Sequence, residues 1–396
     1  MTMSENNFIR VANIIEEAKV GGPQIRMARL AERLSKEVET TVVMPRSNSK
    51  GFEELLRKSE IRYRTISLSR ITREPAAAVQ YVLCSVFEIL ALYIFFKKEA
   101  FDIVHASGGA WQYKGIIAGK LAGCRVIWHL NDTALPRFFR WLFQQLSGIP
   151  DYYIFSSNRT KSYYDSLIKN ESIPTGLVRQ PVNTKEFCSE NETTVNTIAS
   201  DAAHSTITIG TVANINPIKG LELFILVASY LNKQFDNLDF IIVGPVHRAQ
   251  EKYFRHLLEY ADDLQVNNLC FSGKSVDIRR SLSLFDVFLC TSLNESGPLT
   301  LWEAMSMKKA VVTTDVGDVK EHLCSGVSGD IVRVDDAVEM TEKVARLIAD
   351  REKRIRYGEE ARKVILQKFD VDICAASQLS IYRDITFPQN RRDNGQ

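Results

Sequence analysis

The chain has 396 residues, enough for two or three domains of about 150 residues each. Its 50 Lys and Arg residues nearly balance 48 Asp and Glu residues, so the sequence offers no broad basic surface for nucleic acid. The seven cysteines are scattered and form no C-x-x-C pair, which favours reduced thiols in a cytoplasmic protein over a zinc site or a disulfide framework. The polar start of the chain passes directly into a strand pattern, and no signal peptide is expected.

Apolar strand patterns alternate with amphipathic helix patterns along the chain, as in doubly wound parallel sheets. The first strand is predicted at residues 8–15. After a glycine-containing loop, Met27, Leu30, Ala31 and Leu34 recur at helical spacing, which predicts a helix with one face packed on the sheet. The fold class is therefore α/β.

Two apolar segments raise the question of membrane contact. Residues 76–96 nearly have the length of a transmembrane helix, but Gln80, Ser85 and Glu88 interrupt them. A central acidic group costs about 2.5–3.5 kcal/mol on insertion scales, so we predict a buried or interfacial helix. The segment 136–143 mixes arginines with large aromatic side chains. It suits a membrane interface and a lipid-linked acceptor as well as it suits a core helix, and both interpretations stay open.

Hydrophobic periodicity is lost between residues 189 and 205, where polar residues predominate. We predict the interdomain linker there. Residues 1–188 would form the first domain, and a second alternation of strands and helices at residues 206–371 would form another.

Two carboxylates, Glu295 and Glu303, flank a segment that follows a buried-strand pattern at residues 285–290. A carboxylate can accept hydrogen bonds from two neighbouring sugar hydroxyls, as it does on ribose in dinucleotide folds. Two Glu residues at this spacing are common, however, and most Glu residues are solvated.

The same segment contains a helix start. Gly297 and Pro298 precede an apolar-periodic run, with proline predicted at the first helical position. The backbone N–H groups of Leu299 and Thr300 would then point, with the positive end of the helix dipole, toward a bound diphosphate. Strand, loop, carboxylates and helix start together favour a nucleotide-sugar site.

This segment closely resembles the signature of the family 4 retaining glycosyltransferases of the GT-B fold. The order and spacing of further segments extend the resemblance along most of the chain. The matching segments are residues 20–23, 30–34, 39–43, 101–106, 126–129, 180–187, 210–220 and 241–244.

The resemblance implies two Rossmann-like domains facing a central cleft, with the acceptor in the first domain and the donor in the second. It also implies a C-terminal helix, residues 372–390, that crosses back to the first domain. Retention of configuration without a metal or another cofactor is implied as well. The D-x-D pattern at residues 370–372 follows a helix pattern, so we expect it to cap the terminal helix.

Roles for individual residues follow from the resemblance. Glu295 would contact the donor sugar and stabilise developing positive charge, and Glu303 would hold the ribose. Lys219, between a strand and a helix, would stabilise the leaving diphosphate, although a single Lys there is more often solvated. His129 resembles the family histidine near the sugar hydroxymethyl group, although a lone His is as often a core residue. Gly22 would let the backbone approach a phosphate or the acceptor, although a Gly pair is usually a turn.

One position departs from the family pattern. Asn214 stands where the family usually has an Arg, five positions before Lys219. Asn can donate a hydrogen bond to a phosphate but supplies no charge. Either another cation such as Arg248 assists, or transfer is slower, or donor preference differs.

The sequence thus predicts a hexosyltransferase that moves a sugar from a nucleotide-diphosphate donor to a growing glycan or lipid-linked acceptor. Its place would be cell-surface polysaccharide biosynthesis, such as lipopolysaccharide or O-antigen assembly, in the cytoplasm or at the inner face of the cell membrane. Two alternatives stay open. One is a nucleotide-sugar epimerase on the same fold, and the other is a non-catalytic subunit, suggested by Asn214 and Gly297.

Overall fold

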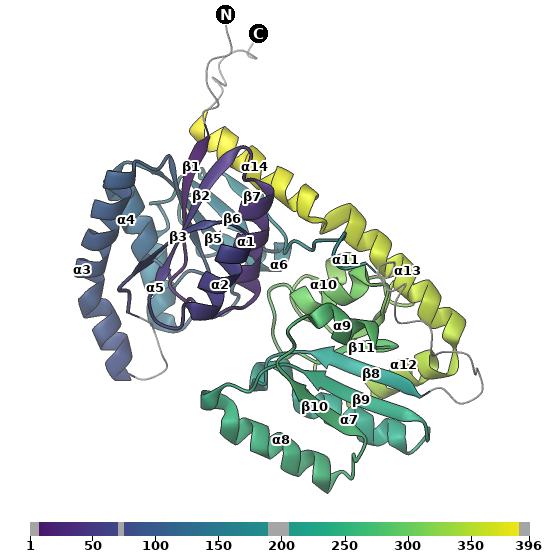
Figure 1. Ribbon diagram of the computed structural model, residues 1–396. Coiled ribbons are helices and arrows are strands. Elements are labelled where there is room, and N and C mark those ends of the chain that lie inside the picture. Colours follow the sequence, from purple (N-terminus) through teal and green to yellow (C-terminus); the bar gives the residue numbers. More distant parts are fainter. Residues whose placement is uncertain (1–7, 70–74, 189–205, 388–396) are drawn as a thin grey trace, which may run out of the picture. The chain divides into compact units, whose positions relative to one another are not determined.

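The computed structural model describes residues 8–69, 75–188 and 206–387. The chain forms two compact units, which are labelled by element in Figure 1. The N-terminal unit comprises residues 1–181 and 371–396, and the C-terminal unit comprises residues 182–370. Each unit is a parallel sheet with helices between its strands, so the predicted α/β class with two Rossmann-like domains is confirmed.

The sheet of the N-terminal unit has seven described strands in the order β3-β2-β1-β4-β5-β6-β7. The strands are β1 (Ile9–Ile14), β2 (Val38–Pro45), β3 (Arg62–Ile66), β4 (Ile103–Ser107), β5 (Arg125–Leu130), β6 (Tyr152–Phe155) and β7 (Thr175–Leu177). All neighbours pair in parallel, and the strand order reverses between β1 and β4. Their mainly apolar sequences fit strands that are covered on both faces.

Helices cover both faces of this sheet. They are α1 (Gly22–Arg33), α2 (Lys50–Lys58), α3 (Pro75–Glu99), α4 (Lys114–Ala122), α5 (Arg137–Leu146), α6 (Asn158–Asp165) and α14 (Val371–Thr386). Helices α3 to α6 share one apolar cluster with the sheet, whereas α1, α2 and α14 pack in clusters on its other face. Ile127 and Trp128, which are consecutive in β5, point into opposite clusters as strand geometry requires.

The terminal helix belongs to the N-terminal unit, where Cys374, Ala375 and Tyr382 join the core. It ends at Thr386, and residues 388–390 of its predicted range lie outside the described residues. Asp372, in its first turn, forms an ion pair with Arg33 of α1. Capping by the D-x-D segment stays a prediction.

The boundary between the units differs from the predicted one. Residues 182–188 pack in the C-terminal unit, because Val182 N donates to Phe369 O at 2.8 Å and the Thr184 hydroxyl donates to Asp370. These contacts are made with residues distant in the sequence, so composition alone gave no sign of them. The predicted linker, residues 189–205, lies outside the described residues.

The sheet of the C-terminal unit has six described strands in the order β10-β9-β8-β11-β12-β13, all parallel. They are β8 (Ile207–Val212), β9 (Leu238–Val243), β10 (Leu269–Gly273), β11 (Val287–Cys290), β12 (Ala310–Thr314) and β13 (Asp330–Val332). Their connections contain η2 (Pro217–Lys219), α7 (Leu221–Asn232), η3 (Arg248–Gln250), α8 (Glu251–Asp263), α9 (Ile278–Ser283), α10 (Leu299–Ser306) and α11 (Val319–His322), and α12 (Ala337–Ala349) and α13 (Arg351–Lys368) follow β13. The strand order reverses between β8 and β11.

Candidate functional site

The candidate site lies where the sheet of the C-terminal unit reverses its strand order. In open α/β sheets, ligands bind beyond the carboxyl ends of the strands at such a reversal. Strands β8 and β11 pair in parallel, so the chain leaves both at the same edge. It then reaches Lys219 after β8 and Glu295 after β11. Two predicted residues that are far apart in the sequence are thereby brought to one place.

Lys219 and Glu295 form an ion pair, and Ser292 Oγ donates to the same carboxylate at 3.1 Å. Their side chains are 25% and 18% exposed, so the pair is shielded but remains open to solvent. Burial by itself lowers the pKa of Lys219, but the charge and hydrogen bond of Glu295 outweigh it, and the pKa is raised above its ordinary value. The ammonium is therefore charged at neutral pH.

Hydrogen bonds connect the loop after β8 with the loop after β11, next to this pair. Thr291 Oγ1 donates to Lys219 O at 2.9 Å, and Leu293 N donates to Ile218 O at 2.8 Å. Gly220 has φ +58°, and a Cβ there would lie 2.2 Å from Thr291 O. Only glycine fits this combination of backbone angle and close approach. The sequence analysis missed Ser292 and Thr291, although their position directly after a strand was an available signal.

Asn214 and Arg248 lie at the same sheet edge as the ion pair, since they follow the paired strands β8 and β9. Both residues are exposed. The backbone of Asn214 lies against Gly244, where a Cβ would be 3.2 Å from Asn214 N. Assistance by Arg248 stays a prediction.

Helix α10 begins at Leu299, and Pro298 is its N-cap residue, one position earlier than predicted. The N–H groups of Leu299 and Thr300 belong to the first turn and have no carbonyl partner within the helix. Binding of an anion by these N–H groups stays a prediction, and the helix has only eight residues.

The loop that follows β12 approaches the loop before α10 closely. Gly317 has φ +55°, and a Cβ there would lie 3.0 Å from the carbonyl carbon of Ser296 and 3.2 Å from Gly297 N. Gly297, which is half-buried, lies between Glu295 and the helix start in the sequence. The loop after β12 therefore packs closely against the loop that leads into α10.

The two predicted carboxylates have different surroundings. Glu303 lies within α10 and is 1% exposed, in contrast to Glu295. Its neighbour Trp302 is also buried and stacks on Phe369 with ring centroids 4.5 Å apart. A ribose contact by Glu303 stays a prediction, and this burial could not be recognised from the sequence.

In the N-terminal unit, His129 lies in a buried chain of side chains. Arg26 Nη1 is 2.6 Å from His129 Nε2, and His129 Nδ1 is 3.1 Å from His105 Nε2. His105 Nδ1 is 2.7 Å from the hydroxyl oxygen of Tyr382 in α14. All four residues are buried, so the chain links α1, β5, β4 and the terminal helix.

The direction of this chain follows from Arg26, because a guanidinium can only donate. His129 Nε2 must accept, so His129 Nδ1 carries the proton and donates to His105, whose Nδ1 donates to Tyr382. Burial and then the charge of Arg26 lower the pKa of both histidines, that of His105 to about 3. Both ring nitrogens of His129 are thus occupied, and its contact with a donor sugar stays a prediction.

Gly22 is the first residue of α1, directly after the N-cap residue Gly21. A Cβ at Gly22 would meet Gln180 Nε2 at 3.9 Å, an ordinary contact. The packing of this unit therefore leaves room for a Cβ atom at position 22. An approach of ligand to this backbone stays a prediction.

A buried ionic network lies where the N-terminal sheet reverses its strand order. Lys114 Nζ, with no exposed side-chain surface, pairs with Glu88 and lies 3.5 Å from Glu16 Oε2. The Tyr81 hydroxyl donates to Glu16, and the Lys114 ammonium lies 3.5 Å from the centre of the Tyr81 ring. Burial raises the pKa of Glu16, although Lys114 and Tyr81 oppose that shift. We call these four residues the Lys114 network.

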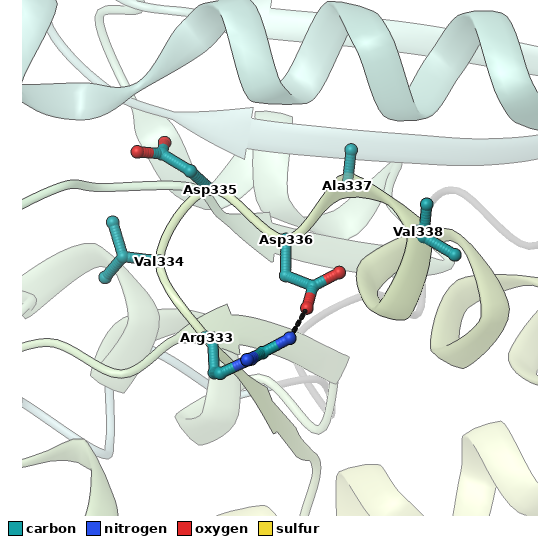
Figure 2. Close-up of a pocket in the computed structure, with 6 residues that line it drawn as sticks. All are labelled: Arg333, Val334, Asp335, Asp336, Ala337 and Val338. Atoms are coloured by element: carbon teal, nitrogen blue, oxygen red, sulfur yellow. Dashed lines mark hydrogen bonds and ion pairs between the residues drawn. The ribbon is translucent and has the colours of Figure 1, made fainter.

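A separate surface hollow lies between β13 and α12, as Figure 2 shows. Arg333 donates to Asp336 at 2.7 Å, and Asp336 also accepts from the backbone N–H of Glu339 at 2.9 Å. Asp336 is thus the N-cap residue of α12, and Arg333 pairs with it. Within the described residues, no group of three or more His, Cys, Asp or Glu side chains is arranged to hold a metal ion.

Two family models match the chain. The model described as Glycosyltransferase Family 4 matches residues 20–184, and the model described as Glycosyl transferases group 1 matches residues 197–364. The first match falls mostly in the N-terminal unit and the second in the C-terminal unit.

Two curated relatives and one solved structure illustrate the similarity. The lipopolysaccharide core biosynthesis mannosyltransferase LpcC of Rhizobium leguminosarum bv. viciae is 24% identical over 251 residues, which are 63% of this chain and 67% of that protein. Alpha-maltose-1-phosphate synthase of Mycobacterium tuberculosis is 35% identical over 114 residues, 27% of this chain and only 30% of that protein. Anabaena HepE, solved in complex with UDP and glucose, superposes with a TM-score of 0.78 over 94% of this chain and 99% of that one, at 17% identity. At this identity the likeness shows the fold, which is GT-B.

Proposed function

Because the chain belongs to the group 1, family 4 glycosyltransferases, we propose that it transfers a hexose from a nucleoside-diphosphate sugar to a growing glycan or a lipid-linked acceptor, retaining the configuration at the anomeric carbon. The observation that carries the proposal is the Lys219–Glu295 pair at the strand reversal of the C-terminal unit. It places a cation and a hydroxyl-binding carboxylate together at the edge where this fold class binds ligands.

The diphosphate is assigned to Lys219 and the start of α10. An ammonium in contact with a single carboxylate can exchange it for phosphate oxygens, which are also anionic hydrogen-bond acceptors. The N–H groups of Leu299 and Thr300 supply further donors at the positive end of a helix. Stabilisation of negative charge on the departing diphosphate is the contribution expected of such preorganised donors.

The sugar is assigned to Glu295 and the ribose to Glu303. In the transfer, the bond from the anomeric carbon to the diphosphate breaks and its electron pair leaves with the nucleoside diphosphate. The acceptor oxygen forms the new bond to that carbon, and the proton lost by the acceptor hydroxyl neutralises the product phosphate. Once Lys219 turns to the diphosphate, the carboxylate of Glu295 is released to accept from sugar hydroxyls and to face the developing positive charge.

The similarity to LpcC, a mannosyltransferase of lipopolysaccharide core biosynthesis, supports a role in cell-surface polysaccharide assembly. The proposal also includes a cytoplasmic location with peripheral membrane contact, and transfer without a metal ion. Transfer in excess chelator tests the last point, since activity that returned only with Mg²⁺ or Mn²⁺ would contradict it.

The proposal is tested by incubating the purified protein with a panel of UDP-, GDP- and other nucleotide sugars and candidate acceptors, followed by mass spectrometry. Release of nucleotide with a mass gain on the acceptor is expected. An isomerised sugar without nucleotide release would indicate the epimerase, and binding without either product would indicate a non-catalytic subunit. Glu295→Gln should abolish most transfer, whereas Glu360→Gln, in a surface pair with Lys363, should not.

A further inference from the structure

Helix α3 carries an uncovered apolar stripe on the N-terminal unit. Six large side chains, each at least 42% exposed, recur along one face over about 18 Å of helix. The stripe consists of Val82, Leu83, Val86, Phe87, Leu90 and Ile94. In Figure 1, α3 runs along the outside of this unit beside α4. A contiguous exposed patch of this kind marks an interaction surface more often than scattered apolar residues do.

The side of α3 that faces the core contains polar as well as apolar residues. Its inward side contains Ser85 and Glu88, both buried, and Glu88 pairs with Lys114. Ser85 donates to Tyr81 O at 2.6 Å and lies 2.9 Å from the hydroxyl oxygen of Tyr113. A surface helix in water normally turns its polar side chains outward. The packing of the unit therefore does not account for the apolar residues outside.

Charge identifies the kind of surface that fits the stripe. The exposed residues Lys97 and Lys98 follow it at the end of the helix, and of the acidic residues of α3, Glu88 faces the core and Glu99 comes last. Helix α5, which packs on the same sheet face, also exposes Phe138 and Trp141. Apolar and aromatic side chains bordered by cations are typical of helices that lie in the interface of anionic membranes.

The buried side of α3 shows that the helix would lie on a membrane and would not span it. Residues 80–99 are long and apolar enough to cross a membrane by length and composition. However, Tyr81, Leu92 and Phe96 are fully buried in the N-terminal core, and spanning would break the Glu88–Lys114 pair. The helix can therefore offer one face to lipid while its other face remains in the protein.

We infer that α3 docks the N-terminal unit on an anionic lipid bilayer, with the stripe in the headgroup–acyl boundary and the helix parallel to the membrane plane. The lysines at its end contact phosphate headgroups. This inference deepens the proposed function, because it supplies the surface at which a lipid-linked acceptor is reached, but its test does not depend on transfer.

The test is co-sedimentation of the full-length protein with vesicles of phosphatidylcholine, with and without phosphatidylglycerol. Wild type should bind, and more strongly when phosphatidylglycerol is present. Leu83→Ser/Phe87→Ser should lower the partition coefficient by at least about tenfold, because two apolar side chains lose their burial in lipid. Lys97→Glu/Lys98→Glu should remove the phosphatidylglycerol dependence. The matched control Val276→Ser/Ile355→Ser changes two exposed apolar residues of the C-terminal unit and should bind as wild type does.

Equal binding by wild type and Leu83→Ser/Phe87→Ser, or no binding by wild type, would overturn the inference. A wild type that is dimeric without lipid and becomes monomeric in the Leu83→Ser/Phe87→Ser variant would also overturn it, since the stripe would then join two copies. Transfer to a water-soluble acceptor, measured on the same variants, separates the two proposals. Loss of vesicle binding with retained soluble transfer is the expected pattern, whereas absence of transfer in all variants would contradict only the proposed function.

Discussion

The two sheets reverse their strand order in the same way, yet they place charge at the reversal differently. In the C-terminal unit, Lys219 and Glu295 meet on loops and remain partly exposed. In the N-terminal unit, Lys114 and Glu16 are almost completely removed from solvent. A charged group that water can reach can exchange its partner for a ligand, whereas a charged group that is fully buried keeps its partner as part of the folded structure. The same topology thus carries a partly exposed ion pair, the proposed binding site, in one unit and a buried ion pair in the other.

Removing the cation of the Lys114 network should have the largest effect. Lys114→Met leaves Glu16 and Glu88 buried without their cation, and we expect a loss of about 3–5 kcal/mol in the free energy of unfolding. Denaturant unfolding measures this loss. The combination of Lys114→Met with Glu16→Gln and Glu88→Gln should recover most of the stability, because no unpaired charge then remains. A loss below about 1 kcal/mol for Lys114→Met would mean that the network is solvated.

Breaking the Lys219–Glu295 pair should lower the rate of transfer more than it lowers the stability of the protein. We expect Lys219→Met to lower transfer about 100- to 1000-fold, the usual consequence of removing one stabilising donor at a developing negative charge. The free energy of unfolding should change by less than about 1 kcal/mol, because the pair is partly exposed. Lys363→Met, in the surface pair with Glu360, is the control for both measurements. Unfolding of Lys219→Met under assay conditions would contradict the contrast between the units.

Acid should act on the N-terminal unit through its buried histidines. His105 and His129 have lower pKa values in the folded state than the ordinary 6.5, so the unfolded state binds more protons below that pH. Their contribution to stability is present above pH 6.5 and falls as the pH decreases below it, in the case of His105 until the pH reaches its folded-state pKa of about 3. Between pH 7.5 and 5.5 the two together should lower the free energy of unfolding by about 3 kcal/mol.

NMR of the imidazole groups provides the direct check on these histidines. Neither ring should titrate in its ordinary range near pH 6.5 in the folded protein, because burial and the charge of Arg26 lower the pKa of both rings. Titration of either ring near 6.5 would contradict the buried chain.

The smallest effect is expected from adding a positive charge near the Lys219–Glu295 pair, measured as nucleotide affinity. Asn214→Arg should tighten UDP or GDP binding by about 1.5–3 kcal/mol, the range for a hydrogen bond to a charged group, and by less if Arg248 already contacts the nucleotide. Isothermal titration of both nucleotides measures this gain. Asn237→Arg is a matched control, because Asn237 is exposed directly before β9, at the opposite edge of the sheet. No gain for Asn214→Arg would show that Asn214 does not face the diphosphate.

Much of the fold could be predicted from local patterns. The helical spacing of Met27, Leu30, Ala31 and Leu34 correctly predicted a helix with a buried face, and all four residues are buried. Such patterns report which side of an element faces the core. They do not report which distant element supplies the partner, and the position of residues 182–188 in the C-terminal unit was missed for that reason.

The candidate site could be predicted in part. Lys219 and Glu295 each follow a strand, and the sheet order brings them together. Lys114 looks like a solvated residue at a helix start, because its partners Glu16 and Glu88 lie far away in the sequence. Residues 76–96 are mostly apolar, and their polar residues Ser85 and Glu88 are buried, so the pattern could not show which face of that helix would remain uncovered.

The position of Tyr382 has a consequence for synthesis of the protein. It completes the hydrogen-bonded chain of His105 and His129, and its helix covers the apolar residues Ile127 and Ile154. The ribosome must add the 189 residues from 182 to 370 before this helix emerges. At about 5–20 residues per second, the nascent N-terminal unit waits about 10–40 s without the helix that completes this face. The protein is therefore expected to depend on holding chaperones during translation, and truncation before residue 371 should leave an aggregation-prone N-terminal unit even though residues 1–181 are intact.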